Sequence, residues 1–335
     1  MVSKKLTAMK KWILFISITS IILVAIINYR IPFFRKNAGP WSIGFGSSVN
    51  FPDKINLRKN TVYSLEKLRE NNSKTGFLAD PFFLKVKDTF YIFFEHQILN
   101  SVAEIGLLSS TDGLNYKYRG TVLKQPFHLS YPQVFKYKND YYMIPETKRA
   151  FSVLLYKAKK FPFQWQVCDT LIKNVEYVDP TIYLSDTLNI MTVCDKDWHL
   201  YMYEADSLFG SWKLHKDPIV MIGSEARCGG RIIPYKNKLL LPIQNCTEGY
   251  GHGVSLYQLA TKNGNYEIKK TKNLFLQPST EIKEFNAGMH HIDIQKIDGK
   301  YYYVYDGNRL IDQEKHLNIR GTLKLTYLDI KNLFF

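Results

Sequence analysis

Residues 79–96 read ADPFFLKVKDTFYIFFEH, and this stretch decides the fold. It holds two alternating, aromatic-rich runs separated by Lys-Asp, which predicts two short strands joined by a tight turn. The same pattern returns in SYPQVFKYKNDYYMIPETK at 130–148, VDPTIYLSDTLNIMTVCDK at 178–196, CGGRIIPYKNKLLLPIQN at 228–245 and MHHIDIQKIDGKYYYVYD at 289–306. The chain therefore contains five copies of one hairpin unit.

The five units are regularly spaced. The first strand of each begins at an equivalent residue, and these residues are 51, 48, 50 and 61 positions apart: Asp80, Tyr131, Asp179, Gly229 and His290. A second, weaker hairpin fills the gap after each unit, which gives four strands per repeat. This arrangement predicts an all-β, five-bladed β-propeller, with a β-sandwich as the alternative.

One blade needs strands from a chain end to close the ring, so that no sheet edge stays unpaired. Long helical periodicity is absent after residue 30, so we expect strands throughout the rest of the chain. Two segments are candidates for the closing strand: WSIGFGSSVN at 41–50 and TLKLTYLDI at 322–330.

The N-terminus carries an uncharged run of 18 residues, Trp12–Tyr29, which is just long enough to cross a bilayer as a helix. Four lysines precede the run and three basic residues follow it up to Lys36, which weakly favours an N-terminus inside. The run lacks a small-x-small cleavage site, so an uncleaved signal anchor is favoured over a cleaved signal peptide. We predict a membrane anchor at 1–36 and an exocytoplasmic propeller at 37–335.

Composition excludes several classes of protein. Aromatic residues make up 15% of the 335 residues, which rules out a disordered chain. Four cysteines without CxxC spacing argue against a disulfide scaffold and against a cysteine zinc site. The net charge of +15 falls to +8 outside residues 1–36, and no nucleic-acid-binding fingerprint accompanies it, so nucleic acid is not an expected partner.

In a propeller, the first strands line a central channel, so equivalent residues meet around one rim. Glu95 and Glu146 follow the second strands, which return to the same end. The repeat alignment therefore predicts one polar funnel, built from Asp80, Glu95, His128, Tyr131, Glu146, Asp179, Glu225, Arg227, Arg231, His290, His291 and Asp293. The loop Gly249–Gly253, which includes His252, could cover this funnel or serve as an ordinary blade connection. Each Asp-Pro step could equally be a structural turn.

Two motifs leave alternatives open. Arg227 and Arg231 flank two glycines, and this spacing suits either binding of an anionic group or an internal salt bridge to Glu225 or Asp179. His290-His291-x-Asp293 looks like a cluster of metal ligands, but adjacent strand residues point to opposite faces. We therefore predict no metal site and no cofactor.

Several runs resemble one known family: 79–95, 109–123, HLSYPQVFKYKNDYYMIPET at 128–147, RCGGR at 227–231 and HHID at 290–293. They are similar to the N-terminal domain of plant glucosamine inositolphosphorylceramide transferases and to bacterial proteins of surface-polysaccharide loci. The resemblance implies a five-bladed propeller similar to arabinanase- and xylosidase-type glycoside hydrolases. The sequence carries no glycosyltransferase domain after the fifth unit, so the resemblance does not imply transferase activity.

Three functional hypotheses remain open. The first is a membrane-anchored carbohydrate-active enzyme, in which Asp80 is the base, Glu146 or Glu225 the acid, and Asp179 tunes their pKa values. The second is a non-catalytic glycan-binding propeller that assists a polysaccharide or glycolipid assembly machine. The third is a non-catalytic protein-interaction propeller in such a machine. A glycosyltransferase is then a candidate partner. The residues that would bind substrate are Glu95, His128, Tyr131, Arg227, Arg231, His252, His290 and His291.

Overall fold

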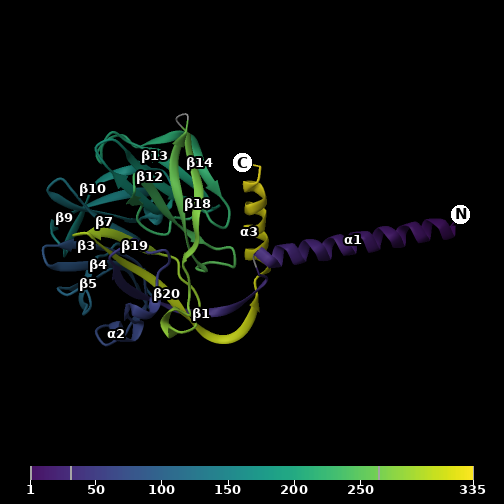
Figure 1. Cartoon of the computed structure of the whole chain (residues 1–335), viewed down its shortest axis with the longest axis horizontal. Helices are drawn as coiled ribbons and strands as arrows, with labels where there is room; N and C mark the ends of the chain where they lie inside the picture. Colours follow the sequence, from purple (N-terminus) through teal and green to yellow (C-terminus); the bar gives the residue numbers. More distant parts are fainter. Residues whose placement is uncertain (1, 31, 263–264, 335) are drawn as a thin grey trace.

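A computed structural model describes residues 2–30, 32–262 and 265–334 of the chain. Within these residues, twenty strands form five four-stranded antiparallel sheets, so the predicted five-bladed propeller is confirmed. Figure 1 shows the sheets gathered into one body, with the N-terminal helix α1 (Val2–Arg30) projecting away from it.

The first four blades each use consecutive strands. In chain order, which runs from the channel outward, the first blade holds β3 (Thr75–Val86), β4 (Thr89–Ile98), β5 (Glu104–Ser110) and β6 (Lys117–Leu123), and the second holds β7 (Ser130–Tyr137), β8 (Asp140–Glu146), β9 (Ser152–Lys160) and β10 (Gln164–Lys173). The third blade holds β11 (Val178–Leu184), β12 (Asn189–Cys194), β13 (His199–Glu204) and β14 (Lys213–Ile222). The fourth holds β15 (Ile233–Tyr235), β16 (Lys238–Asn245), β17 (Gly253–Lys262) and β18 (Asn265–Leu276). The inner strands β19 (Ile292–Ile297), β3, β7 and β11 contact one another in turn around the channel.

The fifth blade is built from both ends of the chain. Its order is β19 (Ile292–Ile297), β20 (Lys300–Leu317), β1 (Phe34–Ser48) and β2 (Thr61–Tyr63). The candidate segment near residues 41–50 is therefore the one that closes the ring. Because β1 already begins at Phe34, the strand starts within the segment expected to be the membrane anchor.

The expectation that no helix follows residue 30 is wrong. Residues 322–330, the other closing candidate, lie in helix α3 (Ile319–Asn332). Their buried residues recur at helical spacing, at Thr322, Leu325 and Leu328. A second short helix, α2 (Leu65–Arg69), and the 3₁₀ turns Leu57–Lys59, Lys148–Ala150 and Lys283–Phe285 complete the fold.

The equivalent starting residues share an unusual backbone in three blades. Asp80, Tyr131 and Asp179 have φ values of 50°, 48° and 51°, and each lies with its following proline in a β-bulge. Left-handed φ is costly for residues other than glycine, so this repeated strain points to a functional position. In the fourth blade the positive φ falls one residue later than the alignment predicts, at Gly230 (141°).

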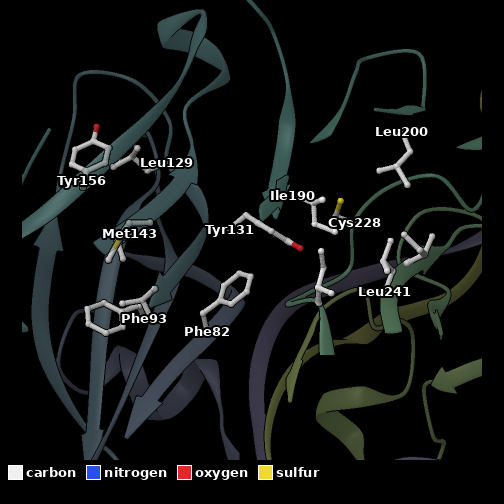
Figure 2. Packing of buried hydrophobic residues seen from close by; sticks show 14 of the residues in the cluster. Phe82, Phe93, Leu129, Tyr131, Met143, Tyr156, Ile190, Leu200, Cys228 and Leu241 are labelled. Carbon is white, nitrogen blue, oxygen red and sulfur yellow. The ribbon is translucent and has the colours of Figure 1, made fainter. Parts of the chain in front are cut away.

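A buried aromatic plug, formed by the rings of Tyr131, Phe82 and His291, lies across the channel. The Tyr131 ring is fully buried, contacts Phe82 edge-on, and points its hydroxyl toward Cys228 (Figure 2). That hydroxyl bonds Thr181 Oγ1 at 2.8 Å and accepts from the Gly230 N–H at 2.8 Å. The plug therefore joins three blades through a single side chain.

The backbone of the fifth blade leaves no room for a side chain at Gly230. A Cβ added there would lie 1.7 Å from the backbone oxygen of Ile292, whereas one added at Gly120, which also has positive φ (101°), would meet open space. We expect Gly120→Ala to cost about 1 kcal/mol of the free energy of unfolding, and Gly230→Ala more than about 4 kcal/mol. Thermal and urea unfolding of both variants in detergent checks this. Equal losses would contradict the tight approach of the fourth and fifth blades.

Candidate functional site

The rim at the start of the inner strands carries a cluster of carboxyl and cationic groups, as the repeat alignment predicts. Opposite the bulges, Glu95 pairs in register with Ala79 and Glu146 pairs with Ser130, each next to a starting residue. The second strands thus return their glutamates to the rim. Seven predicted residues come together in this rim cluster, namely Asp80, Glu95, His128, Glu146, Asp179, Arg227 and His290.

Asp306 organises one side of the rim cluster. This fully buried carboxylate accepts from the backbone N–H groups of Asp80 (2.9 Å), His290 (3.2 Å) and His291 (3.0 Å). It also lies 2.8 Å from His290 Nδ1, while His290 Nε2 lies 3.5 Å from Asp80 Oδ1. The result is a chain of carboxyl, imidazole and carboxyl groups across the first and fifth blades.

Within this network of side chains, the charges of His290 and Asp306 stabilise each other. Burial opposes charge on the imidazole, yet Asp306 and Asp80 raise the pKa of His290 to about 9. Burial also disfavours charge on Asp306, but His290 and the surrounding N–H donors hold its pKa below the ordinary value. Burial raises the pKa of Asp80 well above its ordinary value, an effect that His290 opposes. At neutral pH we therefore expect an imidazolium bonded to the Asp306 carboxylate.

Arg227 neutralises a second buried carboxylate. Its Nε and Nη2 lie 2.8 and 2.7 Å from Asp179 Oδ2, which also accepts from the Gln244 amide at 3.2 Å. The internal salt bridge is thus the alternative that the structure bears out for Arg227. Because this guanidinium faces Asp179, it bonds neither glutamate of the cluster.

Glu146 is the carboxyl group best suited to hold a proton near neutral pH. It remains partly exposed, and burial together with Asp179 raises its pKa to about 7, although Arg227 and His128 oppose the shift. His128 in turn bonds Glu95 at 3.1 Å, and this contact raises the pKa of the histidine. The rim therefore combines a protonatable glutamate with three pairs of opposite charge.

Aromatic rings cover the cluster from above. Trp41 of β1 stacks on His290 with centroids 4.0 Å apart, and Tyr250 lies over Arg227 at 5.5 Å. The loop at 249–253 is tied to the fifth blade, because Gly251 O accepts from Met289 N at 2.6 Å. Its covering role is the alternative that the structure supports. Sugar rings commonly pack on aromatic surfaces of this kind.

Six predicted residues lie outside the rim cluster. Tyr131 and His291 are fully buried in or beside the plug, and His291 contacts the Phe82 ring edge-on. Arg231 bonds Asp293 at 2.8 Å, deeper in the channel. It lines a cavity of about 320 Å³ with Gln133 and Lys136.

The other two outlying residues belong to the fourth blade. Glu225 accepts from Asn245 and Ser255, both at 2.8 Å, and pairs with Lys270. His252 lies 3.9 Å from Glu248. The roles proposed for Glu225 and His252 stay predictions, but neither contacts the rim cluster.

Three contributors were missed by the sequence reasoning. Asp306 ends the fifth repeat sixteen residues after His290, whereas Glu95 and Glu146 each lie fifteen residues after their starting residues, so the alignment passed over it. Tyr250 lies in the loop at 249–253, from which the sequence reasoning selected only His252. Trp41 lies on β1, and its position depends on which segment closes the ring.

One group of described residues could offer three ligand atoms to a metal ion. These atoms, from Asp80, His290 and Asp306, lie within 4.8 Å of one another. The imidazole Nδ1 is engaged by Asp306, and only Nε2 faces Asp80. A metal would have to replace the proton that both carboxyl groups favour on His290, so the donor set fits an ion-pair network better than a cation site.

Comparison with known proteins identifies the family. Residues 56–308 match the family model described as glucosamine inositolphosphorylceramide transferase 1, N-terminal. The chain belongs to this family. Glucosamine inositolphosphorylceramide transferase 1 of Oryza sativa subsp. japonica is 32% identical over 266 residues, covering 75% of this chain and 36% of the relative. The Arabidopsis thaliana protein of that name is 29% identical over 305 residues, covering 82% and 40%.

The chain thus spans 36–40% of the length of these relatives. Among solved structures, an exo-1,5-α-L-arabinanase from a bovine ruminal metagenomic library superposes with a TM-score of 0.50 at 14% identity, covering 70% of this chain and 89% of the other. A protein from Parabacteroides distasonis assigned to the glycoside hydrolases superposes with a TM-score of 0.53 at 12% identity, covering 70% and 88%. At these identities the structural likeness shows the fold alone.

The raised pKa of Glu146 has a consequence for stability. The folded protein retains this proton up to about pH 7, whereas the unfolded chain releases it near 4.5, so ionising Glu146 destabilises the fold as pH rises through that window. We expect Glu146→Gln to be more stable than the parent at pH 8, by up to about 3 kcal/mol, and similar to it near pH 4. Urea unfolding at several pH values measures the difference.

The exposed residue Glu314 provides the control. Glu314→Gln removes a carboxylate of the same chemistry from the surface, and its stability should follow the parent at every pH. A constant offset between Glu146→Gln and the parent across this range would contradict the raised pKa.

Proposed function

We propose that the rim cluster binds a glycan, and that α1 anchors the propeller at a membrane. The observation that carries the proposal is the combination of Trp41 and Tyr250 rings with a paired-charge floor at one rim. Aromatic faces contact the apolar side of a sugar, while carboxyl, imidazole and guanidinium groups bond its hydroxyls. Membership of the transferase N-terminal family supports a carbohydrate ligand.

The segment that follows the anchor contacts the aromatic cover of the rim. The segment Thr7–Ile26 is long and apolar enough to span a bilayer, and none of it is buried by the propeller. Arg35, just after α1, donates from Nη2 to the Tyr250 backbone oxygen at 3.0 Å. This contact ties the aromatic cover of the rim to the residues next to the anchor. It supports a glycan presented near the membrane, such as a glycolipid head group or a polysaccharide under assembly.

A hydrolytic function is the second candidate, and the raised pKa of Glu146 favours it. A general acid must carry a proton when it meets the glycosidic oxygen, and a pKa of about 7 satisfies this requirement. Asp80 would act as the base, although its own pKa is raised by burial. Glu225 is the weaker candidate for the acid, because Asn245, Ser255 and Lys270 engage its carboxylate.

Glycan binding predicts a specific loss on removal of one aromatic ring. We expect Tyr250→Ala to weaken binding of array glycans by about tenfold or more, because the ring is 42% exposed at the rim. Phe209→Ala removes another half-exposed ring, one that packs on Tyr142 away from the rim, and should bind like the parent. Failure of the parent to bind any surface glycan would eliminate the proposal.

Turnover separates the two candidates. If the protein is a hydrolase, Asp80→Asn and Glu146→Gln should each retain glycan binding and lose at least about 100-fold in rate, since acid–base groups contribute that much. Release of reducing sugar from glycans that the array identifies is the measurement. A parent that binds but never cleaves these glycans leaves a binding module.

Anchoring predicts that the full chain stays in the membrane fraction after high-salt and carbonate washing. Removal of residues 1–30 should release it, because β1 begins only at Phe34 and keeps all its pairs. Full extraction of the intact chain by carbonate would contradict a membrane-spanning α1.

A further inference from the structure

Helix α3 has an apolar face that the propeller does not use. Its buried residues, Thr322, Leu325, Leu328 and Asp329, pack against the body. Four large apolar residues point away and are 47–65% exposed: Ile319, Leu323, Tyr327 and Ile330. At roughly 100° per residue these four share an arc of about 80° on the helix. The helix is therefore amphipathic in a way that packing on the propeller does not explain.

Basic residues border this apolar arc. Arg320, Lys324 and Lys331 follow it around the helix, between about 100° and 140° on the same scale. Lys324 Nζ donates to the Lys196 backbone oxygen at 3.0 Å, and Lys331 Nζ lies 3.3 Å from His199, so these two also reach the third blade. An apolar face edged by cations is typical of helices that lie in the interface of an anionic bilayer.

The start of α3 is bonded to the segment that leaves α1. The N–H of Asn318 donates to Phe33 O at 2.7 Å, and Thr322 Oγ1 donates to Pro32 O at 3.1 Å. Because α1 ends at Arg30, the residues to which α3 is bonded lie only two or three positions beyond the helix that we propose crosses the bilayer. The two helices also contact each other directly.

The far end of α3 is fixed on the third blade. Asp329 accepts from the N–H and the hydroxyl of Ser224 at 2.7 and 2.8 Å, and Asn332 Oδ1 accepts from Ile222 N at 3.3 Å. Figure 1 shows α3 running along the flank of the propeller, across the direction of α1. A bilayer that contains α1 along its normal would therefore meet α3 lengthwise.

Two further residues extend the exposed apolar surface toward α1. Phe34 and Leu317 are cross-strand partners where β1 meets β20, and they are 56% and 59% exposed. Phe34 directly follows Phe33, and Leu317 directly precedes Asn318, the two residues whose backbone bond joins α3 to the α1 exit. The surface thus continues from the proposed anchor onto the helix.

We propose that the exposed face of α3, with Phe34 and Leu317, docks into the head-group region of the same anionic bilayer that α1 crosses. The proposal rests on the anchoring part of the proposed function and adds a second, lateral contact. Two contacts at an angle to each other hold the propeller in one orientation on the membrane, which a single helix cannot do. The rim cluster then keeps a constant tilt to the lipid surface.

The test uses the full chain in vesicles of phosphatidylcholine and phosphatidylglycerol. Cys168, the exposed cysteine among the four, is replaced by serine, and Leu323→Cys is labelled with an environment-sensitive fluorophore. Nitroxide-bearing lipids should quench this probe several-fold more than the same probe at Leu114→Cys, a site 58% exposed on the first blade. The same probe at Ile330→Cys should be quenched as strongly as the probe at Leu323→Cys. Adding Tyr327→Glu should reduce the quenching of the Ile330 probe.

The outcomes separate this proposal from the anchoring proposal. A chain that resists carbonate extraction while the Leu323 probe stays as unquenched as the Leu114 probe overturns lipid docking alone. Energy transfer between labelled copies at Leu323, without quenching by lipid, shows a second copy on the face and also overturns it. A chain that carbonate extracts overturns both proposals.

Discussion

Pairing of β1 with β20 is the constraint on which the rest of the structure depends. A ring of five sheets holds together only if its last blade is completed, and the N-terminal strand completes it. Asp306 lies on β20 opposite Ile43 of β1. From there its carboxylate accepts the N–H of Asp80 on the first blade. Ring closure and assembly of the rim cluster are therefore one event, and Trp41 reaches His290 by the same pairing.

Electrostatics explains how so many carboxyl groups share one rim. Burial of an unpaired charge is expensive, so each buried carboxylate has a cationic partner: Arg227 for Asp179, His290 for Asp306 and His128 for Glu95. Among the residues that the structure describes, Glu146 has no such partner within bonding distance, and its pKa is raised instead. The rim is thus nearly balanced in charge while it keeps one group able to exchange a proton near neutral pH.

Much of the fold could be predicted from the sequence, because each hairpin carries its own alternation and turn. The rim cluster was harder to predict from the sequence, because the local backbone conformation decides which residues reach the rim. The bulges at Asp80, Tyr131 and Asp179 coincide with X-Pro steps, which the fifth repeat lacks. Asp306 lies sixteen residues after its starting residue instead of fifteen, so the repeat spacing does not reveal it. The segment LKLTYL alternates like a strand, yet β1 occupies the only place in the fifth blade, and it folds as α3. Sequence spacing alone cannot rank such competitors.

The position of β1 also determines when the propeller can close during synthesis. This strand is among the first to be synthesised, but its partner β20 is made only after the other four blades. Long separation along the chain makes such pairing slow, and an unpaired strand edge invites association with other chains. If α1 enters the bilayer during synthesis, the waiting strand stays tethered beside the site where the last blade emerges. Tethering would raise the local concentration of β1 and β20. It would also reduce aggregation of the propeller before the ring is closed.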